Sequence, residues 1–277
     1  MHRTAFRRSP GEAQESGVRA LVPVRPGPDA KRRLSAVLAP ESRRELALAM
    51  FADVLDALAS ASTVASIVVT GTDAAARTLA EQRGAVWVAE PPGGAGLNAA
   101  LAAALAVDAA QLGAASAQSP AGGDAASSLT VEAARAEPAS APTARATPTL
   151  IVMGDVPLIE ATDIDALVRA MWQLAPAAVA VPSLDGTGTN ALALADARLL
   201  APAFGPESLA RHRQAAAARD LRWAEITQAR VALDIDTPAD LLRLCATVRP
   251  DSATGRCIAG LGLRAELRRV SAEPAPA

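Results

Sequence analysis

The sequence predicts an α/β protein whose sheet is mostly parallel and twisted, with helices on both faces. Short runs of apolar residues alternate with helical patterns along the chain, which is the order that builds a parallel sheet. Apolar residues make up 51% of the 277 residues, but aromatic residues make up only 2%. We therefore expect a core of close-packed aliphatic side chains, in a chain long enough for one or two domains.

The first three strands alternate with two helices. Apolar runs at residues 20–24, 64–70 and 85–89 predict buried strands. A helix is expected to begin at Pro40, since proline is favoured in the first helical turn. Its apolar stripe repeats at three- and four-residue steps and contains Leu46, Ala47, Met50, Phe51, Val54, Leu55 and Leu58. A shorter helical pattern covers residues 73–83.

A change in composition then divides the chain. The glycine- and proline-rich loop 91–98 ends at Asn98, which either contacts a ligand or caps the alanine-rich helix expected from about residue 99. Residues 107–148 contain mainly Ala, Ser, Gly, Pro and Thr without any period. Such a segment cannot bury enough apolar surface to offset its ordering entropy, so we expect a disordered insertion.

Regular patterns resume after this segment. Residues 149–153 and 177–181 are expected to be strands, separated by a helix over residues 163–174. Thr162 and Asp165 are the capping pair expected for that helix.

The last third of the chain carries polar loops between its expected elements. The loop 185–190 precedes the apolar run 191–194, and a helix that carries His212 is expected to open at residues 204–208. Residues 221–226 and 231–236 have strand-like patterns. Thr237, Pro238 and Asp240 together predict the start of a helix, with a threonine cap and proline in the first turn.

Composition excludes several classes of protein. The net charge of −2 implies no nucleic-acid footprint. Cys245 and Cys257 have neither metal-ligand spacing nor the pattern of a disulfide framework, which is typical of the reducing cytoplasm. No apolar run is long enough for a membrane span. We expect residues 1–19 to be a disordered lead-in and residues 249–277 to be a weakly patterned tail.

A basic loop follows the first expected strand. It contains Arg25, Lys31, Arg32 and Arg33, and Lys31 is the only lysine in the sequence. A strand that leads through a basic loop into a helix is a common arrangement for holding phosphates. A solvated basic loop is the alternative, and the loop alone does not decide between them.

Carboxylates follow two of the expected strands. Asp155 comes directly after residues 149–153, and Asp234 and Asp236 alternate along residues 231–236, so both would share one face of a strand. Ligands bind at this edge of open α/β sheets, and Mg²⁺ prefers a few protein oxygens together with phosphates and water. The sequence therefore predicts a magnesium site here, the alternative being that these acids lie in a turn and before a helix cap.

A second group of residues suits a small anionic substrate. Thr189 lies in a glycine loop, Gly205 exposes backbone, and Ser208 lies in the first turn of a helix, where free N–H groups attract anions. Ordinary helix capping would explain the same pattern. His212 lies one turn beyond Ser208, and a lone histidine is more often packed than catalytic.

The chain resembles the CofC family, the 2-phospho-L-lactate guanylyltransferases and their relatives in coenzyme F420 biosynthesis, within the MobA-like nucleotidyltransferases. The resemblance runs from about residue 21 to residue 245. It rests on seven motifs in order: Pro23-Val-Arg-Pro with Ala30-Lys-Arg-Arg-Leu34, Met50 with Asp53-Val, Gly96-Leu-Asn98, Gly154-Asp-Val-Pro-Leu158, Gly188-Thr-Asn-Ala-Leu192, Phe204-Gly205 with Ser208 and His212, and Asp234-Ile-Asp-Thr-Pro-Ala-Asp-Leu241.

The resemblance implies a single Rossmann-like nucleotidyltransferase domain over residues 20–248. It would join GMP from GTP to a phosphorylated three-carbon acid and release pyrophosphate. The acid is 2-phospho-L-lactate, phosphoenolpyruvate or 3-phospho-D-glycerate in different members, and we expect one of the latter two. The alternative is a molybdenum-cofactor or sugar nucleotidyltransferase of the same fold. The next enzyme of the F420 pathway is an implied partner, and the sequence leaves open whether the chain forms a homodimer.

The resemblance also implies the roles of individual residues. It assigns nucleotide binding to Pro23, Val24, Arg25, Lys31 and Asn98, and acceptor binding to Thr189, Gly205 and Ser208. It assigns Mg²⁺ binding to Asp155 and Asp236, with Asp234 beside them. Catalysis is assigned to Lys31, Arg25 and Asp155. Arg25 departs from the lysine usual in the family, which keeps the charge but changes the geometry. No general base is expected, because the attacking phosphate is already ionised.

Overall fold

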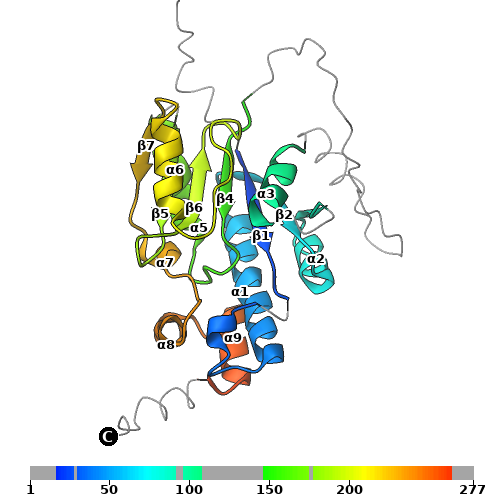
Figure 1. Ribbon diagram of the computed structural model, residues 1–277. Helices are drawn as coiled ribbons and strands as arrows, with labels where there is room; N and C mark the ends of the chain where they lie inside the picture. Colours follow the sequence, from blue (N-terminus) through cyan, green and yellow to red (C-terminus); the bar gives the residue numbers. More distant parts are fainter. Residues whose placement is uncertain (1–16, 28–29, 92–95, 108–145, 175–176, 264–277) are drawn as a thin grey trace, which may run out of the picture.

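The computed structural model describes residues 17–27, 30–91, 96–107, 146–174 and 177–263 (Figure 1). In this part of the chain one sheet has the strand order β3-β2-β1-β4-β6-β5-β7. The strands are β1 (Val18–Val24), β2 (Val64–Gly71), β3 (Val86–Ala89), β4 (Thr149–Val152), β5 (Ala177–Pro182), β6 (Thr189–Leu194) and β7 (Arg222–Glu225).

The sheet is mostly parallel, as predicted. Strands β3, β2, β1 and β4 run parallel to one another, and β7 runs parallel to β5. Strand β6 lies antiparallel between β4 and β5. The carboxyl ends of β1 and β4 therefore lie at the same edge of the sheet, where their loops meet.

Helices cover both faces of the sheet, which confirms the second part of the prediction. They are η1 (Arg32–Leu34), α1 (Pro40–Ser60), α2 (Ala74–Glu81), α3 (Leu97–Leu105), α5 (Ala161–Leu174), α6 (Ser208–Ala217), α7 (Ala229–Ala232), α8 (Pro238–Thr247) and α9 (Ala253–Gly260). Buried side chains of α1, α2 and α5 form a cluster with one face of the sheet. Those of α3 and α6 form a cluster with the opposite face (Figure 1).

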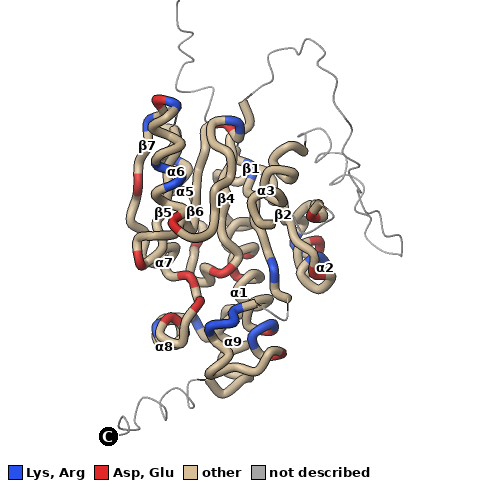
Figure 2. The backbone as a smooth tube through the Cα atoms, in the orientation of Figure 1, with Lys and Arg blue, Asp and Glu red and all other residues tan. Residues whose placement is uncertain are grey.

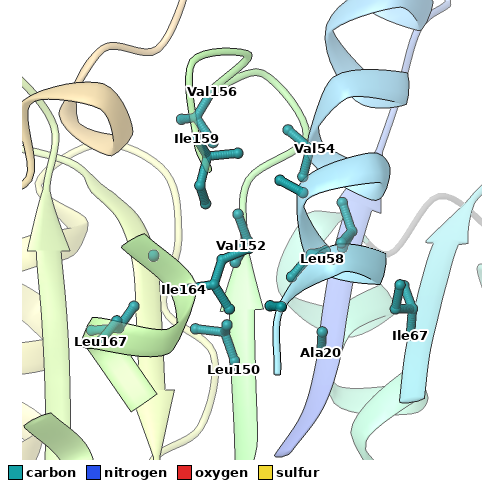
Figure 3. Close-up of a cluster of buried hydrophobic side chains, with 14 of the residues drawn as sticks. Ala20, Val54, Leu58, Ile67, Leu150, Val152, Val156, Ile159, Ile164 and Leu167 are labelled. Atoms are coloured by element: carbon teal, nitrogen blue, oxygen red, sulfur yellow. The ribbon is translucent and has the colours of Figure 1, made fainter. Parts of the chain in front are cut away.

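The strands supply both clusters because successive side chains of a strand point to opposite faces. Leu150 and Val152 belong to the cluster with α1 and α5, whereas Ile151 between them belongs to the cluster with α3 and α6. Figure 3 shows Val54 and Leu58 of α1 on the same face of the sheet as Leu150 and Val152. Both faces of β4 are therefore buried, which explains its continuous apolar run.

The expected weak tail is partly wrong, because residues after 249 form α9. This helix packs on α1 in a third cluster, together with η1 and α8. Its first turn is held by Asp53, whose carboxylate accepts from the N–H groups of Ala253 and Thr254 at 2.8 and 2.9 Å. Sequence patterning missed α9 because only Cys257 and Ile258 of the helix give it an apolar stripe.

Two local predictions are also wrong. Residues 231–236 form no strand: the short helix α7 ends at Ala232, and the chain then runs outside the sheet. Asp165 does not cap α5, since its carboxylate accepts from Ser62 and Thr63 instead. The carboxylate of Asp163 accepts from the N–H of Glu160 at 3.0 Å, so it takes the place of the predicted cap.

Several expectations fall on residues that the structure does not describe. Residues 108–145, most of the predicted insertion, lie outside the described residues, as do residues 1–16 of the predicted lead-in. Residues 18 and 19 of that lead-in belong to β1. Among the described helices, none combines the length and apolarity needed to cross a membrane.

Candidate active site

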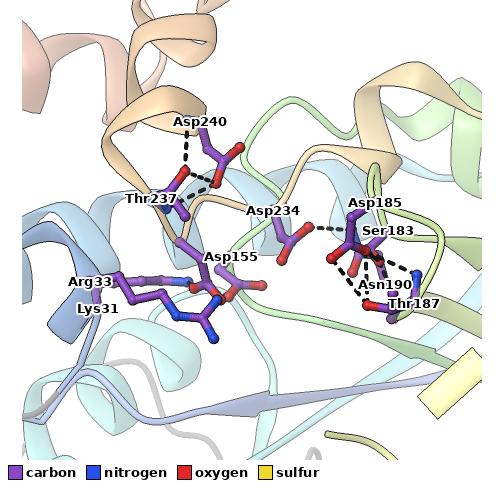
Figure 4. Close-up of polar contacts among 12 residues, drawn as sticks. Lys31, Arg33, Asp155, Ser183, Asp185, Thr187, Asn190, Asp234, Thr237 and Asp240 are labelled. Carbon is purple, nitrogen blue, oxygen red and sulfur yellow. Dashed lines mark hydrogen bonds and ion pairs between the residues drawn. The ribbon is translucent and has the colours of Figure 1, made fainter. Parts of the chain in front are cut away.

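Lys31 lies at the centre of the candidate site, in the loop between β1 and α1. Its backbone is left-handed, with φ of 53°, a region that residues other than glycine seldom occupy. The side chain is only 9% exposed and its Nζ hydrogen-bonds to both Asp155 and Asp236. Figure 4 shows Lys31 extending toward Asp155. An uncommon backbone conformation thus holds the ammonium group against two carboxylates, which is the kind of constraint found at functional sites.

The two carboxylates keep Lys31 charged. Burial alone would lower the pKa of Lys31, but the charges of Asp155 and Asp236 and their hydrogen bonds outweigh it and raise the pKa. Burial would likewise raise the pKa of Asp236, and the charge of Lys31 reverses this and lowers it. Figure 2 shows where charged residues lie along the backbone, with acidic segments near α7 and α8.

Tight backbone contacts and a helix cap position the two carboxylates. Asp155 follows Gly154, where a Cβ would lie 3.1 Å from the carbonyl oxygen of Pro23, so a side chain there would crowd the end of β1. Asp236 directly precedes the capping box of α8, in which Thr237 and Asp240 bond reciprocally as predicted. The carboxylates thus come from different loops but face the same nitrogen.

Asp155 and Asp236 are the carboxylates predicted to bind magnesium. The Asp236 Oδ1 atom lies 2.9 Å from the Lys31 Nζ atom, which also bonds to Asp155 Oδ2, so the ammonium group of Lys31 fills the point that both carboxylates face. Mg²⁺ uses one or two protein carboxylates together with phosphates and water. Within the described ranges, no group of three or more His, Cys, Asp or Glu side chains could hold a metal. Magnesium binding by Asp155 and Asp236 stays a prediction.

Asp234 points to a different partner. Its carboxylate accepts from Asn190 Nδ2 at 3.1 Å, and burial together with the charge of Asp155 raises its pKa. The same amide group donates to the carbonyl oxygens of Val231 and Ala232, both at 3.0 Å. Asn190 therefore fastens the chain before Asp236 to β6. The sequence placed Asn190 in the polar loop 185–190 and did not suggest this role, because the structure starts β6 at Thr189.

The basic loop lines a cavity of about 240 Å³ at the ends of β1 and β4. Pro23, Val24, Arg25 and Lys31, all predicted to bind the nucleotide, contribute to its wall, as does Asp155.

Arg25 does not contact the acids that hold Lys31. Its guanidinium group bonds in a fork to Glu90, with Nε 2.8 Å from Oε1 and NH2 2.6 Å from Oε2. Glu90 was not singled out in the sequence, although it directly follows β3 at the same edge of the sheet.

A larger cavity of about 740 Å³ adjoins the first. Thr189, Gly205 and Ser208, predicted to bind the acceptor, all line it. Asp155 and Asp236 line both cavities, together with Leu97 and Met153. The two carboxylates therefore stand at the boundary between a site near the basic loop and a site near the polar loops.

Hydrogen bonds within the larger cavity fix its hydroxyl groups. The Ser208 Oγ atom accepts from the backbone N–H of Thr189 at 2.8 Å, and the Thr189 Oγ1 atom lies 3.1 Å from His212 Nδ1. Gly205 has φ of +109°, a conformation that residues with a side chain rarely adopt. Ser208 thus ties β6 to α6 rather than capping its own helix.

Asn98 lies beside this cavity and is neither a cap nor a wall residue of the nucleotide cavity. It is the second residue of α3, which begins after Gly96. Its side chain bonds to the backbone of Phe204 in both directions, accepting from N at 2.7 Å and donating to O at 3.0 Å. Asn98 therefore positions the loop that contains Gly205, and its predicted contact with the nucleotide stays a prediction.

Comparisons with known proteins show the family of this chain. Residues 47–229 match the model of the MobA-like NTP transferase domain. A phosphoenolpyruvate guanylyltransferase of Sphaerobacter thermophilus is 36% identical over 225 residues, covering 81% of this chain and 91% of that protein. A 3-phospho-D-glycerate guanylyltransferase of Phenylobacterium zucineum is 34% identical over 228 residues, covering 81% and 88%.

Solved structures share the fold. A putative nucleotide-diphospho-sugar transferase from Desulfovibrio desulfuricans G20 superposes with a TM-score of 0.55 at 13% identity, covering 91% of this chain and 98% of that one. A 4-diphosphocytidyl-2C-methyl-D-erythritol synthase from Anaerococcus prevotii has a TM-score of 0.50 at 10% identity, covering 85% and 97%. At such identities the likeness extends to the fold alone.

Proposed function

Because this chain belongs to the MobA-like NTP transferase domain family, we propose that it transfers a guanylyl group from GTP to a phosphorylated three-carbon acid. Phosphoenolpyruvate and 3-phospho-D-glycerate are the proposed acceptors, since relatives at 36% and 34% identity carry these names. The product is a GDP-linked acid that enters coenzyme F420 biosynthesis. The observation that carries the proposal is the pair Asp155 and Asp236 at the boundary of two adjoining cavities.

The reaction is a phosphoryl-group displacement. A phosphate oxygen of the acid attacks the α-phosphorus of GTP and forms a new P–O bond, while the bond between that phosphorus and the β-phosphate bridging oxygen breaks and pyrophosphate leaves. The attacking phosphate is already ionised, so no proton has to be removed by a base. Catalysis then consists of holding two anions together and neutralising the charge that repels them.

The basic loop supports this role on the nucleotide side. Lys31 is charged, nearly buried and aimed at the boundary of the two cavities, and Arg33 lies 3.9 Å from Asp236 with a side chain that is 75% exposed. Lys31 would neutralise the phosphates of GTP next to the point of attack. Arg25 would contribute a guanidinium group from the same cavity, with Glu90 holding its orientation.

Asp155 and Asp236 would hold Mg²⁺, and their position on the walls of both cavities supports this role. When bound, Mg²⁺ supplies charge neutralisation for the triphosphate and the departing pyrophosphate. Asn190 and the capping box of α8 keep Asp236 in place for this task. On the acceptor side, the hydroxyl groups of Thr189 and Ser208 and the backbone at Gly205 would contact the acid.

The proposal is tested by offering the protein GTP and Mg²⁺ with each of the three acids in turn. Pyrophosphate release and the mass of the GDP-linked acid are measured. Turnover with phosphoenolpyruvate or 3-phospho-D-glycerate is expected. A preference for 2-phospho-L-lactate in competition would contradict the proposed acceptor, and turnover only with sugar phosphates or a molybdenum-cofactor precursor would contradict the proposed reaction.

A further inference from the structure

His212 is buried beside the acceptor cavity but lines neither that cavity nor the one near the basic loop. We propose that His212 is a positioning residue whose neutral ring, protonated at Nδ1, forces the Thr189 hydroxyl to donate its hydrogen to an anionic oxygen in the acceptor cavity. The inference rests on the proposed function, because it names the group that orients an acceptor-binding residue.

The protein backbone selects the protonated nitrogen of the ring. The N–H of Ala203 donates to His212 Nε2 at 3.1 Å, so Nε2 carries no hydrogen. A neutral imidazole has one N–H, which must then be at Nδ1. Nδ1 lies 3.1 Å from Thr189 Oγ1, so the ring donates and the threonine oxygen accepts. The edge of the ring also contacts Phe204, with ring centroids 4.9 Å apart, which fixes its plane.

The environment keeps the ring neutral. His212 is fully buried, and burial together with the nearby positive charge of Arg211 lowers its pKa from 6.5 to about 4. The ring therefore holds a single proton at neutral pH, and the two hydrogen bonds decide where that proton resides.

Thr189 is left with one hydrogen to give. Among the described residues, the Oγ1 atom of Thr189 bonds to His212, and that bond uses the oxygen as an acceptor. Thr189 is among the residues that line the acceptor cavity, so we expect its hydroxyl hydrogen to be directed to a ligand oxygen there. Ser208 is arranged in the same way, since its Oγ accepts from the N–H of Thr189. Two residues that line the cavity thus use their hydroxyl oxygens as acceptors within the protein, and their hydroxyl hydrogens would suit a carboxylate or phosphate.

The tautomer is measured directly by NMR. The sequence contains only two histidines, His2 and His212, so the imidazole nitrogen signals of the full-length protein can be assigned by comparison with a His2→Gln variant. We expect His212 to be protonated at Nδ1 and bare at Nε2 at neutral pH. A ring protonated at Nε2, or at both nitrogens, would overturn the inference whatever the enzyme's activity.

Kinetics then separate positioning from packing. The amide nitrogen of asparagine and the Nδ1 atom of histidine are separated from Cβ by the same number of bonds. The His212→Asn variant can therefore keep a hydrogen-bond donor to Thr189. His212→Gln places its amide at the distance of Nε2 and can keep only the bond to Ala203. The KM of the acid should rise at least about tenfold in His212→Gln and less in His212→Asn, with the KM of GTP unchanged.

A double-mutant cycle with Thr189→Val completes the test. If His212 acts through the threonine hydroxyl, His212→Gln should add little to the loss already caused by Thr189→Val. Fully additive losses, or an equal rise in both KM values, would show a packing role and overturn the inference. Wild-type protein that turns over none of the acids would refute the proposed function instead, and the tautomer measurement would still stand alone.

Discussion

Replacing Asp155 or Asp236 by asparagine tests the pair that joins the two cavities. Each substitution keeps the side-chain volume and removes one negative charge beside Lys31, to which both residues hydrogen-bond. Loss of one preorganised electrostatic contact typically lowers kcat by a factor of about 10² to 10³. A ligand of Mg²⁺ should cost at least this much, so turnover should fall by about 10² or more in both variants.

Stability should change much less than activity. Lys31 keeps its other carboxylate in either variant, and the mutual repulsion of Asp155 and Asp236 is relieved. The Asp236 side chain is also 43% exposed, so solvent screens its pair with Lys31. We expect the free energy of unfolding to change by no more than about 1 kcal/mol.

Asp234→Asn is the matched control. Asp234 is two residues from Asp236, but its carboxylate bonds to Asn190 and not to Lys31. Pyrophosphate release is measured at saturating GTP and Mg²⁺, with thermal melting curves taken on the same preparations. Near-normal turnover in both the Asp155 and Asp236 variants would refute the reasoning. A larger loss for Asp234 than for Asp236 would show that the metal-binding carboxylate had been misassigned.

Four further outcomes are expected. Acylation of the Lys31 amine, followed by intact mass, should be far slower in the folded than in the unfolded protein. The reason is that burial shields the side chain and a raised pKa keeps its ammonium group protonated. Equal rates would contradict the buried position of Lys31. Thr237→Ala should lower the free energy of unfolding by about 1 kcal/mol and Tm by about 2–4 °C, because it removes the capping box of α8. An unchanged melting curve would show that the cap does not contribute to stability. The pKa of His212 falls from 6.5 to about 4 on folding, so between these two pH values the unfolded chain binds more protons than the folded protein. The free energy of unfolding should therefore decrease as the pH drops from 6.5 to about 4. Denaturant titrations of His212→Asn should show a weaker dependence on pH. Replacing residues 108–145 with a short Gly/Ser linker should leave turnover within a few-fold, and a folded but inactive variant would mean that the segment has a role in the site.

Comparison of the predicted and observed elements shows where sequence patterns are reliable. Apolar runs located β1, β2, β4 and β5 to within two residues at either end, and the stripe of α1 was read correctly from its spacing. These elements bury most of their side chains, so the requirement for an apolar face is written directly into residue order. The Thr237 and Asp240 cap was predicted correctly for a similar reason, since both of its bonds are local.

Predictions failed where a side chain had two available partners. Asp165 could cap its own helix or bind Thr63, and packing of α5 against the end of α1 decided for the distant partner. Asn98 could cap α3 or bond to Phe204, which is 106 residues away, and it does the latter. The local sequence cannot distinguish a helix cap from a bond to a distant partner, because the energies of the two competing hydrogen bonds are similar.

By itself the sequence determined the layered α/β fold, the edge of the sheet at which charged residues collect, and some of the residues that line the two cavities. Only the tertiary structure decided which polar side chains meet. It paired Lys31 with Asp155 and Asp236, Arg25 with Glu90, and Asp234 with Asn190. Burial patterns depend on neighbours along one element, whereas these contacts join segments between 44 and 205 residues apart. Such contacts exist only once the sheet has brought its loops to a common edge.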